Sequence, residues 1–562
     1  MAGKAFGVQS PTQGETAVSW QTWTDGSGNV PTISGDANWG KLKLDLSGEE
    51  GRSAVYDLGS ETTRKFTLTE NRYGTGEEDA TLQYRTDTSS FAQDDVLPAW
   101  TTYSAPFSVN CRYVQVREIT LSIVTYYVDA TGGDDDNTGL SIDQAWQTLT
   151  KVSSITFDPG DHILFKRGET FVGSLIPQGA GTDSQYIVFG VYGTGSRPII
   201  DGSSSRAFLI ADSDYHHLRI EHIDFSGCEV VANRSTVECW THDVYWYDCI
   251  FRDSAGTSNS FGYNSYALTA GGAEIYNLTL DSCEIYNNNN SGLNIGSSAG
   301  TYGPHDCLVT NCISHDNGTN YWADHGFYCK HGVTFDKCTA YNNSFGGGFK
   351  TNCQSVFTSP YHPRVTNCVS YNNYMGIVAD NIGSVIYNNL FYGNTNRTVS
   401  MSSDGRSSLI YFNTFVNTTA SGDGLIFIDS GLPTNVIYKD NLFIQDRAVS
   451  NIPVVVGSGV TLANLISNNT FDYNTYYHGD ATTLFYDGTT RTWTDWTGYG
   501  AEAHGTLLAA VPDFVARYTD LHPSDGGNLK ALGAAIAGYG YDKDSNARAD
   551  PPTPGCYEEA SA

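Results

Sequence analysis

A short phrase that returns many times along the chain is the feature that most constrains the fold. From about residue 215 onward, a small residue followed by an alternating apolar residue recurs roughly every 20 to 35 residues, as in "YDCIFRDS", "DSCEIYNN" and "YFNTFVNT". The equivalent position is filled by Asp224, Cys249, Cys283, Cys312, Cys338, Cys368, Asn389, Asn413 and Asn441. A repeat of this length predicts a solenoid.

Each repeat contains a second strand-like run. These runs read "SGLNIGS", "HGFYCKHG", "GGFKTNC", "MGIVADN", "TVSMSSD" and "GLIFIDS". They are brief, they are split by Asn and Gly turns, and no helical periodicity separates them, so they predict a parallel β-helix. Like side chains then stack coil upon coil about 4.8 Å apart. We therefore expect the cysteine column to be a ladder of buried, unpaired thiols, and the absence of a CxxC motif argues against a metal site there.

The composition favours a β-rich protein and excludes several partners. Charged residues make up 16% of the 562 residues, with 59 Gly and 36 Tyr, a profile that suits strands and turns. The formal charge of −30 repels nucleic acids and anionic membranes. It also repels an anionic polysaccharide unless cations or a locally basic groove intervene. No apolar run approaches the length needed for membrane insertion.

The first residues bear on location. The stretch "MAGKAFGVQSPTQGE" lacks the apolar core of a secretory signal. Two interpretations stay open: a signal has been removed, or the protein is released by lysis, as virion parts are. Either one predicts an extracellular or virion location.

Three stretches outside the repeat resemble a known superfamily. The stretch "YYVDATGGDDDNTGLSIDQAWQTLTKV" (126–152) leads into "FDPGDHILFKRGETFVGSLIPQ", and the chain closes with "LKALGAAIAGYGYDKDSNARADPPTPGCYEE" (529–559). Together they resemble the capping turn, first coils and closing segment of right-handed parallel β-helix proteins of the pectate-lyase type. The resemblance implies an all-β solenoid. It does not select a reaction, because lyases, hydrolases, epimerases and phage tailspikes share this fold.

The chain divides into three expected parts. Residues 1–123 do not repeat; they alternate like strands and end in "CRYVQVREITLSI", which resembles a jelly-roll or discoidin-like β-sandwich. This part is either an attachment or carbohydrate-binding module, or a spacer or assembly domain. Residues 124–500 are expected to form the β-helix, as the catalytic domain, and residues 501–562 a closing segment packed on it.

The run "DHGFYCKHG" (324–332) is the candidate site. Aligning the second strands by their leading glycine sends Phe327 and Cys329 inward and gives two outward columns. The first column holds Asn294, Tyr328, Lys350 and Val378, and the second holds Gly296, Lys330, Asn352 and Asp380. Asp324 and His325 lie where the chain enters this face, and His331 lies where it leaves.

Two lysines on neighbouring coils are unusual in so acidic a chain. Two ammonium groups close together lower each other's pKa, which a lysine needs in order to act as a base. The alternative is a solvated face with ion pairs such as Lys330–Asp380. We interpret the face as part of a polysaccharide-cleaving groove.

The chemistry that fits best is β-elimination on a uronic-acid-containing polysaccharide. A base removes the carbon-bound proton next to the carboxylate, an acid protonates the leaving oxygen, and a cation or amide neutralises the carboxylate. Lys330 or Lys350 is the candidate base, and Tyr328 or His325 the candidate acid. The candidate substrate-binding residues are Asn352, Asn294, Arg364, Asp380, His331 and Asp324.

Two other functions stay open. The first is hydrolysis by a pair of carboxylates from Asp324, Asp380 and Asp404, as in tailspike glycosidases of this fold. The second is a non-catalytic tailspike or adhesin that binds a surface glycan. A homotrimer and a monomer are equally compatible with the sequence, and other virion proteins are candidate partners.

A metal is not assigned. Ca²⁺ is the candidate ion, because lyases of this superfamily often use it and Asp380 could hold it. The run "DATGGDDDNTG" (129–139) lacks EF-hand spacing, so a solvated turn is favoured there. His216 and His217 are expected to flank a strand.

Overall fold

The fold is that of a computed structural model of the 562-residue chain. It describes residues 4–9, 39–44, 51–52, 56–66, 68–71, 80–87, 89, 101–102, 107–120, 123–202, 206–210, 215–228, 237–239, 241–254, 261–265, 275–297, 304–318, 324–352, 361–417, 424–428, 431–445, 454–456, 460–479, 484–516 and 520–558. The chain forms two compact units. These are Met1–Val124 with Thr182–Tyr186, and Thr125–Gly181 with Ile187–Ala562.

The first unit contains two antiparallel sheets. One has the order β2-β1-β5, and the other has the order β3-β8-β6-β7 with β4 also paired to β8. The strands are β1 (Lys4–Gln9), β2 (Trp39–Leu44), β3 (Gly51–Arg52), β4 (Tyr56–Phe66), β5 (Leu68–Asn71), β6 (Ala80–Asp87), β7 (Thr101–Thr102) and β8 (Phe107–Thr120). The sandwich topology and the role of this unit stay predictions.

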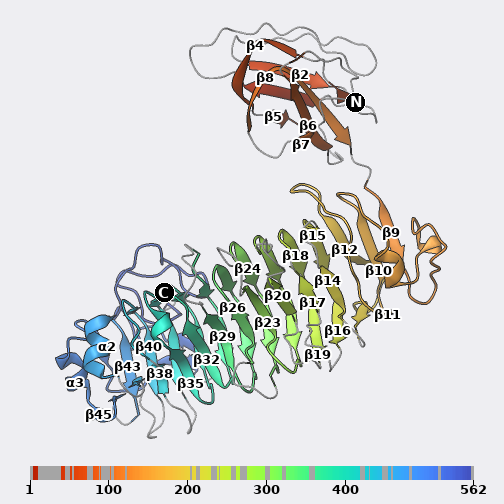
Figure 1. The fold of residues 1–562 in the computed structure, drawn as a ribbon. Helices are drawn as coiled ribbons and strands as arrows, with labels where there is room; N and C mark the ends of the chain where they lie inside the picture. Colours follow the sequence, from red (N-terminus) through yellow and green to blue (C-terminus); the bar gives the residue numbers. More distant parts are fainter. Residues whose placement is uncertain are drawn as a thin grey trace. The chain divides into compact units, whose positions relative to one another are not determined.

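The second unit is a right-handed parallel β-helix, as the sequence predicts (Figure 1). Three long parallel sheets follow one another around each coil, and strands three elements apart pair in register. Sheet 1 contains β9 (Thr125–Val128), β10 (His162–Lys166), β12 (Ile187–Tyr192), β15 (Leu218–Glu221), β18 (Val244–Tyr247), β21 (Leu278–Asp281), β24 (Cys307–Thr310), β27 (Val333–Asp336), β30 (Arg364–Thr366), β33 (Val385–Tyr387), β36 (Leu409–Tyr411), β39 (Ile437–Lys439) and β42 (Thr470–Asp472).

Sheet 2 follows sheet 1 in each coil. It contains β11 (Thr170–Val172), β13 (Ile199–Asp201), β16 (Asp224–Cys228), β19 (Ile250–Ser254), β22 (Glu284–Tyr286), β25 (Ile313–His315), β28 (Thr339–Tyr341), β31 (Val369–Tyr371), β34 (Leu390–Tyr392), β37 (Thr414–Asn417), β40 (Leu442–Gln445), β43 (Thr475–His478) and β46 (Thr506–Leu507).

Sheet 3 completes the coil and carries the candidate site. It contains β14 (Phe208–Ile210), β17 (Val237–Cys239), β20 (Phe261–Ser265), β23 (Leu293–Ser297), β26 (Phe327–Cys329), β29 (Gly347–Asn352), β32 (Met375–Asp380), β35 (Arg397–Met401), β38 (Gly424–Ile428), β41 (Val454–Val456), β44 (Phe485–Tyr486) and β45 (Thr490–Arg491). Its last strand, β45, pairs antiparallel with β44.

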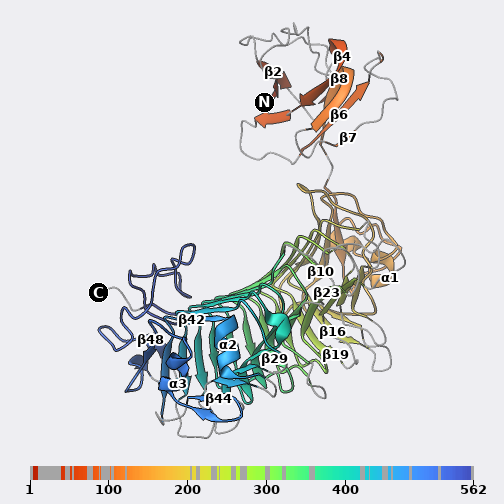
Figure 2. The same cartoon turned by 60° about the vertical axis from the view of Figure 1, so that its left-hand side comes forward.

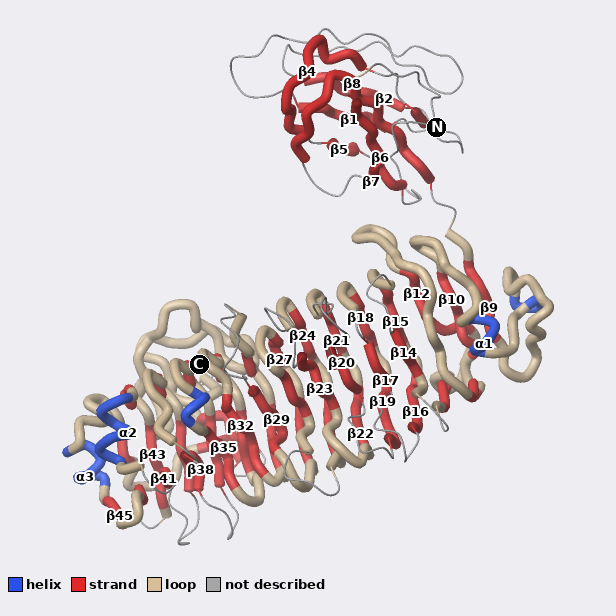
Figure 3. The backbone as a smooth tube through the Cα atoms, in the orientation of Figure 1, coloured by secondary structure: helices blue, strands red, loops and turns tan. Residues whose placement is uncertain are grey.

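Helices are short, and most lie near the two ends of the solenoid, whereas one follows β35 (Figures 2 and 3). They are η1 (Ile142–Gln144), α1 (Leu149–Val152), η2 (Ser403–Gly405), α2 (Leu462–Asn468) and α3 (Trp493–Gly498). None of the described helices has the length and apolar character needed to cross a membrane. A small antiparallel pair, β47 (Phe514–Ala516) and β48 (Asp520–Pro523), follows the last coil.

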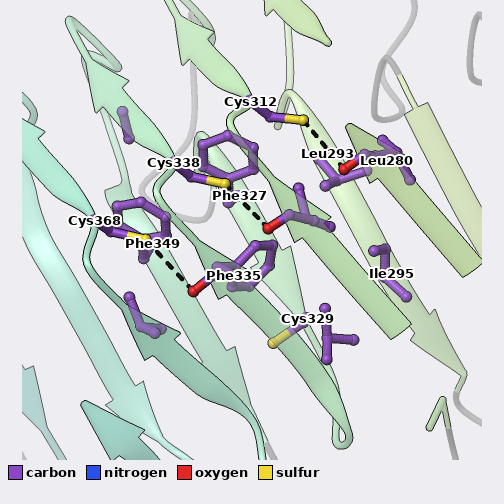
Figure 4. Packing of buried hydrophobic residues seen from close by; sticks show 14 of the residues in the cluster. Leu280, Leu293, Ile295, Cys312, Phe327, Cys329, Phe335, Cys338, Phe349 and Cys368 are labelled. Atoms are coloured by element: carbon purple, nitrogen blue, oxygen red, sulfur yellow. Dashed lines mark hydrogen bonds between the residues drawn. The ribbon is translucent and has the colours of Figure 1, made fainter. Parts of the chain in front are cut away.

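The predicted cysteine ladder lies inside the β-helix (Figure 4). The five cysteines are buried and free, and each thiol donates to a main-chain carbonyl of a neighbouring turn, as Cys338 does to Val309 at 3.3 Å. The ladder continues through Asn389, Asn413 and Asn441, whose side-chain amides donate to the next side-chain oxygen. Stacking therefore replaces covalent cross-links in this core.

One residue, Asp224, was assigned to this column wrongly. Asp224 pairs with Ile250, and the main-chain N–H of Ile250 donates to Ile223, so Ile223 precedes Cys249 in the column. Asp224 instead forms an ion pair with Arg252 at 2.9 Å. The alignment of the phrase "HIDFSG" with the later coils is therefore wrong by one residue. Asp resembles the small and polar residues of those coils more than Ile does.

The turn before the column explains the abundance of Asn and Asp. Residues just before it adopt a left-handed backbone, including Asn311 with φ 53°, Asn367 with φ 55° and Asp440 with φ 57°. Asn and Asp tolerate this region better than most residues. The same left-handed position recurs in successive coils from His222 to Tyr473.

The polar ladder ends on a buried carboxyl group. Asn441 donates to Asn474 at 2.9 Å, and Asn474 donates to Glu502 Oε1 at 2.8 Å. Tyr476 also donates to Glu502 Oε1 at 2.8 Å. Because Glu502 is buried, its pKa is raised to about 8 despite these donors.

Residues near the end of the chain pack on the β-helix. The main-chain N–H of Ala534 donates to Asp440 at 2.7 Å, and Arg548 donates to Asn388 at 2.7 Å. Leu529 is buried against Val416 and Leu442 on the outer face of sheet 2. This segment therefore covers apolar surface that the last coils would expose.

We expect titration of the denatured, unreduced protein to find Cys249, Cys283, Cys312, Cys338 and Cys368 as free thiols. Their sulfur atoms are engaged with main-chain carbonyls and are not paired with each other. Quantification with a thiol reagent, followed by peptide mapping, measures this. Any disulfide among these five would contradict the ladder.

We expect Glu502→Gln to flatten the dependence of the melting temperature on pH. The folded-state pKa of about 8 lies above the ordinary value of 4.5, so the folded protein holds a proton that the unfolded chain releases between these values. Stability contributed by this group is therefore present below about pH 4.5 and is lost as pH rises to about 8. Calorimetry of both proteins across this range tests it, and equal slopes would refute the assignment.

Candidate functional site

The outward face of sheet 3 has the register that the sequence predicts. Asn294 pairs with Tyr328, Tyr328 with Lys350, and Lys350 with Val378. In the next column Asn352 pairs with Asp380. Since Phe327, Phe349 and Ile377 are fully buried on the opposite face, the polar side chains between them must point away from the core.

Lys330 lies beside this pair of columns. Its main-chain N–H donates to Ile295 at 2.9 Å, just past the end of β26. A Cβ atom on Gly296 would lie 3.3 Å from Lys330 Cδ. The missing side chain at Gly296 therefore leaves room for the lysine stem to lie flat on the sheet.

The two lysines differ in their electrostatic surroundings. Burial and the Lys350 ammonium both lower the pKa of Lys330. Burial also lowers the pKa of Lys350, but the Asp380 carboxylate opposes this shift. Both lysines therefore release a proton more readily than a solvated lysine, and only at Lys350 does a carboxylate oppose this.

Tyr328 connects the two columns. Asn352 Nδ2 donates to the Tyr328 hydroxyl at 3.0 Å, and Lys350 Nζ lies 5.8 Å from the centre of the tyrosine ring. Burial raises the pKa of Tyr328, although the hydrogen bond from Asn352 opposes the rise. Because the phenol oxygen accepts from Asn352, its own proton is available for another acceptor.

Asp380 is a partly buried carboxyl group at the edge of the site. Ser402 donates its main-chain N–H to Asp380 Oδ1 at 3.0 Å. Burial raises the pKa of Asp380, the Lys350 ammonium opposes this, and Asp404 raises it further. Two of the three carboxylates considered for hydrolysis, Asp380 and Asp404, are therefore electrostatic neighbours.

His325 does not lie at the rim as an exposed acid. It is buried, and its Nδ1 accepts the Gly347 main-chain N–H at 2.7 Å. Its own main-chain N–H donates to Ser291 Oγ at 2.9 Å. Burial and the nearby Lys350 ammonium hold the pKa of His325 well below its ordinary value, so the ring is neutral. It supports the strand beneath the site and is poorly suited to donating a proton.

Asp324 is likewise buried and does not reach the outward face. A Cβ atom on Gly346 would lie 2.1 Å from the Asp324 main-chain oxygen, and one on Gly318 would lie 2.6 Å from Asp324 Cβ. The residue is therefore packed between two turns. The prediction that it contacts substrate is not supported by this placement.

Two further predicted binding residues lie elsewhere. Arg364 is the first residue of β30, which belongs to sheet 1 and is exposed there, so it does not come from a loop next to the sheet 3 face. His331 leaves the face as expected but is buried. Its pKa is lowered to about 4 by burial, Lys330 and His362. Arg364 was expected in a loop next to the face and instead begins a strand of sheet 1, whereas the position of His331 after β26 is as expected.

Three side chains in the region of the candidate site were not predicted from the sequence. His362 is exposed near His331, and its Nδ1 donates to the Ile382 carbonyl at 3.0 Å. Phe345 and Tyr374 are exposed at the turns that enter β29 and β32. All three lie in turns, where the alternation that located the lysines carries no information.

No metal centre is evident in the part of the chain that the structure describes. Among these residues, no group of three or more His, Cys, Asp or Glu side chains could hold a metal ion. In the run 129–139, Asp129 accepts main-chain N–H groups of Thr131 and Gly132, and Asp135 accepts those of Gln147 and Thr148. These carboxylates organise a turn. His216 and His217 directly precede β15.

Comparison with known proteins gives a partial match to a glycoside hydrolase. No family model matches the chain. A lacto-N-biosidase from Bifidobacterium longum subsp. longum is 38% identical over 200 residues, which cover 30% of this chain and 12% of that protein. The chain therefore spans only a small part of this curated relative's length.

Solved structures with similar folds are distant in sequence. They include a GH136 lacto-N-biosidase from Eubacterium ramulus (16% identity, 68% of this chain and 66% of that chain, TM-score 0.39) and the pectate lyase Pel9A (14%, 78% and 98%, 0.40). A mannuronic-acid-specific polysaccharide family 6 lyase from human gut microbiota has 12% identity, coverage of 69% and 91%, and a TM-score of 0.41.

We expect Lys350→Met to raise the pKa of Lys330. The Lys350 ammonium opposes the charging of Lys330, so its removal should shift the Lys330 titration upward while the effect of burial remains. Carbon-13 NMR titration of labelled lysines measures this shift. Lys439→Met is a matched control, because Lys439 also lies over a tyrosine ring, Tyr473, but on sheet 1. An unchanged Lys330 titration would show that the two ammonium groups do not interact.

Proposed function

We propose that this protein is a glycan-degrading enzyme that cleaves a uronic-acid-containing polysaccharide by β-elimination on the outward face of sheet 3. The single observation that carries the proposal is the pair of partly buried lysines beside Tyr328. Their pKa values are lowered, as a general base requires, and that of the tyrosine is raised, as a general acid requires.

Lys330 is the base in this proposal. Both influences on its pKa, burial and Lys350, act in the same direction and favour the neutral amine. A neutral amine can take the carbon-bound proton next to the sugar carboxylate. Activity that depends on this amine should rise with pH through the Lys330 pKa.

Tyr328 is the acid. It lies two residues from Lys330 on the same strand face, so a distance of roughly 7 Å between the two positions leaves space for a sugar ring. The C–O bond to the leaving sugar breaks as a C=C bond forms, and the phenol proton goes to the leaving oxygen. The raised pKa keeps that proton in place until it is transferred.

Lys350 and Asn352 neutralise the sugar carboxylate. The Asp380 carboxylate favours the charged form of Lys350, so in this proposal Lys350 carries the positive charge and Lys330 acts as the base. A chain with a formal charge of −30 repels polyanions in general. Two lysines on one outward face supply the locally basic groove that such a substrate needs.

Hydrolysis is the second candidate, and two observations favour it. Burial raises the pKa of Asp380 and Asp404 adds to the rise, which favours the protonated carboxyl group that a general acid needs. The partial relative is a lacto-N-biosidase. In this alternative Asp380 is the acid, and Asp404 acts as nucleophile or base.

The two reactions give different products. Incubation with alginate, polygalacturonate and hyaluronan should produce unsaturated uronate, detected by its ultraviolet absorbance, if β-elimination occurs. New reducing ends without that absorbance, or release of p-nitrophenol from a p-nitrophenyl lacto-N-bioside, would instead support hydrolysis. No product from either set would leave the protein as a glycan-binding tailspike or adhesin.

We expect Lys330→Ala or Lys350→Ala to lower turnover on the cleaved glycan by at least about 10²-fold, with the melting temperature nearly unchanged. Lys439→Ala is the control and should retain activity, because this lysine makes a similar contact with a ring on sheet 1. If both lysine variants keep full activity while Asp380→Asn and Asp404→Asn lose it, hydrolysis replaces β-elimination.

A further inference from the structure

The turn that enters β29 differs from its neighbour in length. The coil-to-coil bond from Asn343 to Asn373 and the pairing of Gly347 with Met375 fix both ends of the two turns. Between these ends the first turn contains Ser344, Phe345 and Gly346, whereas the second contains Tyr374 alone. The extra residues bring Phe345 out of the coil at the edge of sheet 3.

Phe345 and Tyr374 are exposed, which is unusual for aromatic side chains of these coils. Their exposed fractions are 43% and 38%. In contrast, Phe349 is fully buried, and Tyr371 stacks on Tyr341 with ring centres 5.0 Å apart. Neither Phe345 nor Tyr374 stacks on another aromatic ring among the described residues, so their faces can receive a ligand.

The position of this turn is fixed relative to the site. Gly347 donates its main-chain N–H to His325 Nδ1 at 2.7 Å, and the Met375 N–H donates to the Gly346 carbonyl at 3.1 Å. A Cβ atom on Gly346 would lie 2.1 Å from the Asp324 main-chain oxygen. The buried Asp324 and His325 therefore hold the Phe345 turn against the coil, and the Met375 bond places Tyr374 beside it.

The two aromatic side chains lie at one end of the strands that carry the polar site. Gly347 begins β29 and Asn352 ends it, so the strand leads from the aromatic turn past Lys350 to the Asn352–Asp380 pair. Six residues of strand span roughly 17 Å. A sugar chain lying along this strand would place one unit over Lys350 and another near Phe345.

From this arrangement we infer that Phe345 and Tyr374 form a stacking subsite for a sugar ring of an acidic oligosaccharide whose neighbouring unit lies over Lys350. The inference rests on the proposed function of the sheet 3 face and adds a substrate-length requirement to it. Aromatic faces bind the apolar faces of sugar rings, and the Tyr374 hydroxyl provides a polar contact at the rim. The subsite binds and orients the substrate and takes no part in bond breaking.

Affinity electrophoresis in gels containing alginate, polygalacturonate or hyaluronan tests this subsite. In the gel that retards the wild type, Phe345→Ala and Tyr374→Ala should each weaken binding about three- to tenfold. Phe345→Trp should restore or strengthen it. Tyr499→Ala is the matched control, because Tyr499 is 39% exposed and follows α3, away from the sheet 3 site in sequence.

The outcomes separate this subsite from the catalytic proposal. Wild-type affinity in both alanine variants, in a gel that retards the wild type, overturns the subsite and leaves the proposed reaction standing. Weaker binding in both variants without any cleavage by the wild type supports the subsite and rejects the reaction. A wild type that no gel retards overturns both. For a cleaved substrate, both alanine variants should raise KM for long oligosaccharides and leave kcat close to the wild-type value.

Discussion

The side-chain ladder inside the coils is the interaction on which the rest of this structure depends. Each amide of the column donates to the next, as Asn413 does to Asn441 at 3.0 Å, and the same side chain also donates to a main-chain carbonyl. A one-residue slip would place the amides among apolar side chains and leave them without partners, at a cost of about 1–3 kcal/mol each. The ladder therefore fixes the register of every sheet at once.

The fixed register determines which residues lie on the outward face. It does not determine their chemical type. Phe327 and Phe349 stack inside with ring centres 5.2 Å apart, and this contact determines that Tyr328 pairs with Lys350 on the outside. Nothing in the core requires those outward residues to be a tyrosine and a lysine. Burial lowers the pKa of both lysines, and the Lys350 ammonium lowers that of Lys330 further, a cost that a solvated face of serine and threonine would avoid. The lowered pKa values of the two lysines are therefore a property of the site and do not arise from the packing of the core.

The sequence predicted the strands better than it predicted the corners. Alternation located Tyr328, Lys330 and Lys350 because successive strand residues face opposite ways whatever the surrounding coils do. The loop position expected for Arg364 was wrong, since neither face nor spacing reveals that this short run forms a strand of sheet 1. Alternation also failed for His325, whose burial results from the Gly347 turn folding over it. The two-residue alternation of a strand gives no information about the length of a turn or about which segments bury a side chain.

The corners are where this solenoid can vary without disturbing its ladder. The three residues between Asn343 and Gly347 leave the bond from Asn343 to Asn373 intact at 2.8 Å, so the insertion alters the edge of sheet 3 and not its register. Glycine is required at position 346 because the Asp324 main chain approaches too closely for a side chain. A rigid core thus positions the polar groups, and short corner insertions determine what can lie beside them. In the proposed function, a polymer would be selected by the corner residues and would react over the strand that carries Tyr328.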